Sequence, residues 1–195
     1  IVATKWDLEK PMIFKGSVKQ AHGRQATFVP GFGCTISDAV QASCSAYPYF
    51  EKKVVETSAG DRFELIDGGF CANNPTLYAI ADAAIAMALP HSSLRVVRVG
   101  VGVYPKPTTL FMNLLEKIIV VRLLPQILEI NTQSMDQLRT NLFKDIPTVR
   151  INETFERPEM ATDLFEHDLM KLNVLRQRGR ESFASKESEL RALLQ

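Results

Sequence analysis

The sequence of 195 residues predicts a mixed α/β fold. Short runs rich in Val, Ile and Phe alternate along the chain with segments whose apolar residues recur at helical spacing, a pattern typical of α/β domains. A carboxylate and two glycines, Asp67-Gly68-Gly69, join one expected strand to one expected helix. The net charge of +1 and the 46% of hydrophobic residues indicate neither a disordered chain nor a polyanion-binding protein.

The first third of the chain is expected to contain two strands, a loop and a helix. Residues 1–4 and 12–14 are short apolar runs that predict strands, and the polar, Gly-containing stretch 16–33 predicts a loop. Thr35 and Asp38 have the spacing of a capping box, so a short helix should follow them.

The middle of the chain predicts a hairpin and then a helix. Residues 53–57 and 62–66 are β-rich runs separated by the four residues 58–61, which is a plausible hairpin length. Asn74 as N-cap and Pro75 at the first helical position fit the preferences for helix starts. One face of this helix is expected to carry Leu77, Ile80, Ala81, Ala84 and Ala88.

The second half of the chain is expected to be mostly helical. The Val-rich run 94–103 predicts a buried strand, and two or three helices should follow over 110–143 with a break near Pro125. Residues 148–151 predict a short strand, and a long charged helical pattern begins at Asp163. The most apolar stretch is 110–130, and charged residues interrupt it. It therefore does not qualify as a membrane span, which needs about 20 nearly uncharged residues.

The cysteines and the first residues indicate the setting of the protein. Cys34, Cys44 and Cys71 are odd in number and lack metal-ligand spacing, which favours a reducing, cytoplasmic compartment over a disulfide framework. The chain begins without Met and without signal-peptide features, so we expect it to start inside a larger protein. The three histidines are scattered, without partners at metal-ligand spacing, and are expected to be surface or loop residues.

Residues 66–75 are the segment in which chemistry is expected. A carboxylate at the end of a buried strand lies where open α/β sheets bind ligands, and glycines let another backbone or a substrate come close. Partial desolvation should raise the pKa of Asp67 and make it a better base. The residues alone leave a second interpretation open, in which Asp67 only orders a turn, because Asp-Gly is a common turn signal.

Residues 67–75 resemble the aspartate motif of the patatin-like phospholipases, in which Asp-Gly-Gly or Asp-Gly-Ala is followed shortly by Asn-Pro. Residues 36–50 are similar to that family's short helix with small Ser and Ala residues, a proline and an aromatic pair. The resemblance identifies residues 1–105 as the C-terminal part of the catalytic domain. Residues 106–195 would be a mostly helical region packed on the same domain.

This resemblance implies a three-layer α/β domain and a calcium-independent lipid acyl hydrolase of the phospholipase A type. No metal or cofactor is therefore expected. In the family a serine on a Gly-x-Ser-x-Gly turn attacks the acyl ester, and an aspartate takes its proton without an intervening histidine. By motif position Asp67 would be the catalytic aspartate, Gly68 and Gly69 would shape the active-site turn, and Asn74 and Pro75 would cap the helix after the motif.

The nucleophile that the resemblance implies is not in this chain. No serine has a glycine at both −2 and +2; Ser58, for example, has Gly60 at +2 but Glu56 at −2. The serine and the Gly-rich oxyanion segment are therefore expected in the N-terminal part of the same protein. This chain alone should be inactive.

The expected partners are membrane phospholipid or another acyl-ester lipid, met at membrane surfaces, and no nucleic acid. The apolar residues of 112–121 are expected to form core or an oligomer contact, which leaves a homo-oligomer open. Many intracellular members of the family are inactive until a partner or small molecule arrives, and some bacterial ones respond to cyclic nucleotides. The rival interpretation is a non-catalytic binding or assembly module that kept the fold, against which the presence of Asp67 argues mildly.

Overall fold

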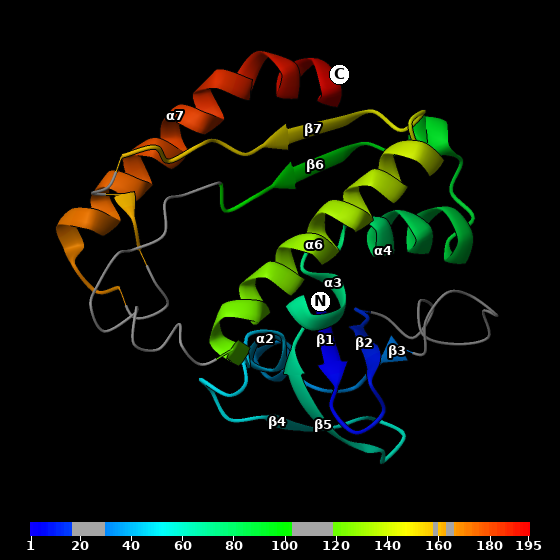
Figure 1. Cartoon of the computed structure of the whole chain (residues 1–195). Coiled ribbons are helices and arrows are strands. Elements are labelled where there is room, and N and C mark those ends of the chain that lie inside the picture. Colours follow the sequence, from blue (N-terminus) through cyan, green and yellow to red (C-terminus); the bar gives the residue numbers. More distant parts are fainter. Residues whose placement is uncertain (17–29, 103–118, 158–159, 163–165) are drawn as a thin grey trace. The chain divides into compact units, whose positions relative to one another are not determined.

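The chain forms two compact units of contacting residues. The computed structural model describes residues 1–16, 30–102, 119–157, 160–162 and 166–195 (Figure 1). Unit 1 comprises Ile1–His91 and Leu124–Lys144, and unit 2 comprises Ser92–Leu123 and Asp145–Gln195. These units are groups of neighbours in space, so the predicted domain division at residue 105 stays a prediction. The α/β class is confirmed, because both units combine strands with helices.

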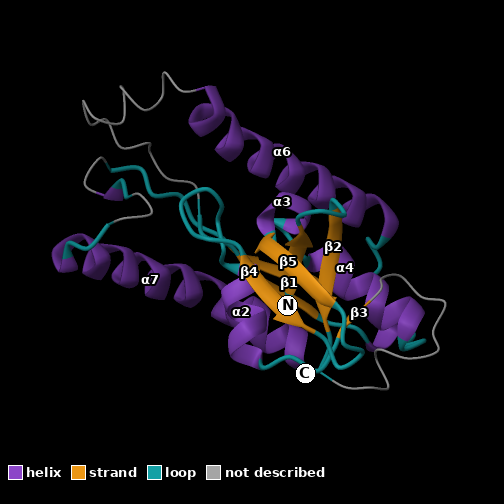
Figure 2. Cartoon of the chain, turned by 90° about the horizontal axis from the view of Figure 1, so that it is seen from below, coloured by secondary structure: helices purple, strands orange, loops and turns teal. Residues whose placement is uncertain are grey.

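Unit 1 contains a five-stranded sheet with the order β3-β2-β1-β5-β4 (Figure 2). Every neighbouring pair is antiparallel except β2 and β3. The predicted first two strands and the predicted hairpin are confirmed, whereas most of the predicted loop at 16–33 lies outside the described residues. The strands are β1 Val2–Lys5, β2 Lys10–Phe14, β3 Pro30–Gly31, β4 Lys53–Glu56 and β5 Arg62–Asp67.

Helix α2 packs against this sheet. It spans Ile36–Ser43 and contacts β1, β4 and β5. Its predicted capping box is confirmed, because the Thr35 hydroxyl accepts the Asp38 N–H at 3.0 Å and donates to the Asp38 carboxylate at 2.6 Å. The core between helix and sheet consists of Ala3, Met12, Phe14, Ala39, Ala42, Val55 and Leu65.

The helix predicted after Pro75 is present, but its buried face differs from the expected one. Helix α4 spans Thr76–Ala81 and continues as a π-helical segment over Asp82–Ala86. A π turn holds one more residue than an α turn, so it shifts the later residues around the helix. Ala86 is buried in this segment, whereas Ala88 lies beyond the C-cap Met87 and is exposed with a φ of 53°.

Helix α6 spans Ile119–Leu142, so the predicted break near Pro125 is wrong. A proline removes one backbone hydrogen bond of a helix. Here it lies in the second turn, and most of the helix follows it within unit 1. The earlier part of the predicted helical region, residues 110–118, lies outside the described residues. In the described part of the chain no helix is both long and apolar enough to cross a membrane.

Unit 2 contains a two-stranded parallel sheet and the longest helix described. β6 Val96–Val99 pairs with β7 Thr148–Ile151, and α7 Leu169–Leu194 packs on β7. The Asp168 carboxylate caps α7 by accepting the Met170 N–H at 2.8 Å. The two strands and the long helix are confirmed, although β6 is not buried as predicted. In this small sheet Val99 of β6 stays 77% exposed, because alternate residues of a strand point to opposite faces.

Candidate active site

Asp67 is the last residue of β5, an inner strand of the unit 1 sheet. Its backbone is held from two sides. The Thr4 hydroxyl on the neighbouring strand β1 donates to the Asp67 carbonyl at 2.9 Å, and the Asp67 N–H donates to the Ser45 carbonyl at 2.9 Å. Thr4 is 9% exposed, so this hydroxyl is committed to the interior. These hydrogen bonds hold the end of β5 and the backbone of Asp67 in place.

The Asp67 carboxyl is half-buried and accepts the backbone N–H of Gly69 at 2.6 Å. Burial raises the pKa of this carboxyl, and the Gly69 hydrogen bond lowers it in part. In the described residues no hydrogen bond joins the carboxylate to a serine or histidine side chain. Its second oxygen is therefore available to a group from outside the described part of the chain, and the raised pKa suits a proton acceptor.

Gly68 and Gly69 are required by space rather than by unusual backbone angles. Gly68 has an ordinary helical conformation, with φ −66° and ψ −22°. A Cβ at Gly68 would collide with the Val2 carbonyl, and one at Gly69 would lie 3.0 Å from the Asp67 carboxylate. The two glycines thus let β1 and the Asp67 carboxylate approach the turn, which leads into the short helix α3 Gly69–Ala72.

Helix α6 lies next to this turn. Leu128 Cδ2 is 3.6 Å from the position that a Cβ at Gly69 would take. The Asn73 amide donates to the Thr132 hydroxyl at 2.7 Å, and that hydroxyl donates to the Leu128 carbonyl at 3.0 Å. Sequence reasoning did not find these α6 residues, nor Thr4, because no local pattern marks a partner about 60 residues away.

Cys71, in α3, has a half-buried thiol. Its sulfur is 3.3 Å from the Thr4 hydroxyl and 3.5 Å from the Gly68 carbonyl oxygen. Burial raises the pKa of the Cys71 thiol, and the Thr4 hydrogen bond lowers it in part. A raised pKa keeps cysteine in its weakly nucleophilic thiol form, so Cys71 serves packing.

Asn74 and Pro75 lie at the start of α4, with the helix beginning one residue later than predicted. Pro75 occupies the N-cap position, and α4 starts at Thr76. The Asn74 side chain is nevertheless directed at the helix start, because its carbonyl oxygen accepts the Thr76 N–H at 3.3 Å and the Thr76 hydroxyl at 2.7 Å. Helix ends commonly differ by this amount between descriptions.

The histidine in the described part of unit 1 is His91, which contacts an aromatic ring. The His91 ring packs edge-on against Phe143 with the ring centroids 5.5 Å apart. Among the residues that the structure describes, no three His, Cys, Asp or Glu side chains are grouped so that they could hold a metal ion.

Comparison with known proteins agrees with the motif. Residues 14–80 match the family described as patatin-like phospholipase, a range that includes α2 and the turn at Asp67. Over all 195 residues the chain is 66% identical to an Escherichia coli protein named cUMP-AMP-activated phospholipase, and it spans 61% of that protein's length. No solved structure matches the chain. The resemblance inferred from the sequence is confirmed by both comparisons: residues 14–80 match the patatin-like phospholipases, and the whole chain is similar to a phospholipase.

Proposed function

We propose that this chain supplies the general base of a lipid acyl hydrolase of the phospholipase A type. The observation that carries the proposal is the half-buried Asp67 carboxylate, held by the Gly69 N–H at the end of β5 with a raised pKa. The match of residues 14–80 to the patatin-like phospholipases supports a lipid ester as the substrate, because the matched residues include this turn. The serine nucleophile and the oxyanion donors would come from another part of the same protein.

In this mechanism Asp67 accepts and donates a proton in each of two steps. As the serine oxygen attacks the acyl ester carbonyl, the Asp67 carboxylate takes the hydroxyl proton and then passes it to the departing alcohol. A water molecule next attacks the acyl-serine, and Asp67 accepts the proton of that water and returns it to the serine. A carboxylate with a raised pKa gives a larger driving force for each proton uptake than an ordinary one.

The same proposal extends to regulation. The relative is named for activation by cUMP-AMP, a compound of one UMP and one AMP unit, and it is 66% identical to this chain over the chain's 195 residues. We infer that the protein containing this chain also responds to a nucleotide of this chemistry. The chain alone is expected to be inactive, because no serine in it is flanked by the glycines of a Gly-x-Ser-x-Gly turn.

Hydrolysis of long-chain phospholipid by the full-length protein tests the activity. We expect fatty acid release in the presence of cUMP-AMP and EDTA, because a Ser-Asp dyad needs no metal ion. Release that disappears in EDTA and returns with calcium would contradict the dyad. A full-length protein that binds lipid without hydrolysing it would favour the non-catalytic module.

A further inference from the structure

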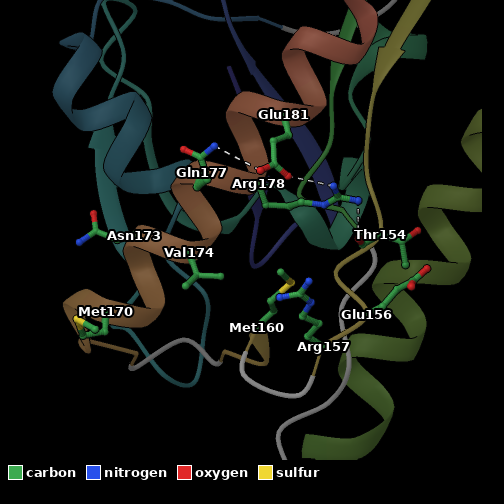
Figure 3. A pocket seen from close by; sticks show the side chains of 10 residues that line it. All are labelled: Thr154, Glu156, Arg157, Met160, Met170, Asn173, Val174, Gln177, Arg178 and Glu181. Atoms are coloured by element: carbon green, nitrogen blue, oxygen red, sulfur yellow. Dashed lines mark hydrogen bonds and ion pairs between the residues drawn. The ribbon is translucent and has the colours of Figure 1, made fainter.

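Unit 2 contains a cavity that has no part in the site around Asp67. It has a volume of about 650 Å³, within the range of about 300–1,000 Å³ that is usual for small-molecule sites. Its walls are the segment that follows β7 and the first half of α7. Figure 3 shows Arg157 and Met160 from that segment facing a row of side chains on α7.

Two arginines give this cavity the means to hold phosphate. Arg157 and Arg178 both line it, and a guanidinium presents a planar set of donors that matches a phosphate group. Arg178 is held by ion pairs of 3.2 Å to Glu181 and 3.4 Å to Glu153. Charge-assisted hydrogen bonds are usually about 2.7–2.9 Å long, so both pairs are loose. An incoming phosphate could replace these carboxylates at small cost.

The rest of the lining suits a nucleobase. Asn173 and Gln177 are four residues apart on α7, so both amides project from the same face of the helix. Asparagine and glutamine amides can pair with both hydrogen-bonding atoms on the edge of adenine. Met160 and Met170 add flexible thioether side chains, which adapt to flat apolar surfaces.

We propose that this cavity is the binding site for the activating nucleotide, with Arg157 and Arg178 holding phosphate and Asn173 and Gln177 reading a base edge. The proposal rests on the nucleotide regulation inferred above. The carboxylates of Glu156 and Glu181 also line the cavity, so its arginine and glutamate charges balance before ligand arrives. Glu181 therefore acts as an internal competitor that the phosphate displaces from Arg178.

Isothermal titration of the full-length protein with cUMP-AMP tests this assignment. Arg157→Gln and Arg178→Gln should each weaken binding by ~10–100-fold, the usual effect of losing a charge-assisted hydrogen bond. Glu181→Gln should instead tighten binding several-fold, because it removes the competing charge. Arg176→Gln is the matched control, since Arg176 lies two residues from Arg178 and thus about 200° around the same helix. It should bind as the wild type does.

The outcomes separate this proposal from the hydrolase itself. Asp67→Asn should bind cUMP-AMP normally, because binding here requires no catalysis. If both arginine variants bind cUMP-AMP as tightly as the wild type does, the cavity assignment is wrong. It is also wrong if Glu181→Gln weakens binding of cUMP-AMP. In either case the hydrolase proposal stands. If the wild type hydrolyses lipid but binds no nucleotide, the regulation and the cavity assignment fail together. Melting temperatures near that of the wild type would show that each variant is folded.

Discussion

Asp67 combines a fixed backbone with a partly desolvated side chain. The Thr4 hydroxyl and the Ser45 carbonyl hold its peptide groups, while within the described residues its carboxylate accepts one hydrogen bond, of 2.6 Å, from Gly69. A buried ionised group with few donors is costly, and the raised pKa of Asp67 reflects this cost. At the scale of the residue, burial of the ionised Asp67 carboxylate thus lowers the stability of the folded protein and raises the basicity of the carboxylate.

This cost should appear in the pH dependence of stability. Because the folded-state pKa of Asp67 is raised, the folded protein holds its proton more tightly than the unfolded chain does. The free energy of unfolding therefore falls as pH rises from the ordinary aspartate pKa of about 3.9 through the raised value. Asp67→Asn lacks this titration, so its stability relative to the wild type should improve as pH rises through that window. A difference that is constant with pH, measured by urea unfolding, would contradict this account.

Gly68 and Gly179 should respond in opposite directions to the same substitution. Gly68→Ala places a Cβ against the Val2 carbonyl, a backbone atom that cannot move aside easily, so we expect a loss of about 1–3 kcal/mol. Gly179 lies within α7, where an added Cβ meets nothing within 4 Å. Gly179→Ala should stabilise the protein by about 0.5–1 kcal/mol. Denaturant unfolding measures both, and equal effects would show that the space around Gly68 is not limiting.

At the scale of elements, a side-chain hydrogen bond links α6 to the segment that follows the Asp67 turn. Asn73 follows α3, and its amide reaches the Thr132 hydroxyl on α6. Leu128, one turn earlier on α6, lies beside Gly69. We therefore expect the helix to limit how far the turn after Asp67 can move, and we propose Thr132 as a positioning residue.

Thr132→Val tests this link against a control on the same helix. Thr132 and Thr140 each donate a hydrogen bond to the carbonyl four residues earlier, but only Thr132 also accepts one from the motif. Thr132→Val should cost about 0.5–1.5 kcal/mol of stability and lower kcat, because the Asp67 turn becomes less ordered. Thr140→Val should leave kcat unchanged. Equal kcat values in the two variants would show that α6 does not position the turn.

At the scale of the whole molecule, the sequence predicted those features that depend on neighbouring residues. The capping box at Thr35, the hairpin and the strand leading to Asp67 follow from local spacing and turn chemistry. The buried face after Pro75 was predicted only in part, since a π-helical segment interrupts the α-helical period. The exposure of β6 depends on how many strands its sheet has, which a single run of valines does not reveal.

The candidate site shows the same division. Asp67 and its glycines were found because they form a contiguous motif. Thr4 and Thr132 were not found, because they are 63 and 59 residues from the groups they bind. Supporting contacts of this kind arise from the arrangement of strands and helices. The residues next to Thr4 or Thr132 in the sequence do not predict them.

The central claim is that Asp67 is the base of the dyad, and turnover by Asp67→Asn in the full-length protein tests it most directly. Asparagine keeps the shape of the side chain and can still accept the Gly69 N–H, but it cannot take the serine's proton. We expect kcat to fall by ~10²–10⁴-fold or more with an intact fold, the usual consequence of losing a general base. Asp7→Asn, the same change on an exposed turn, is the control and should retain full activity. A kcat of Asp67→Asn near that of the wild type would remove Asp67 from the mechanism.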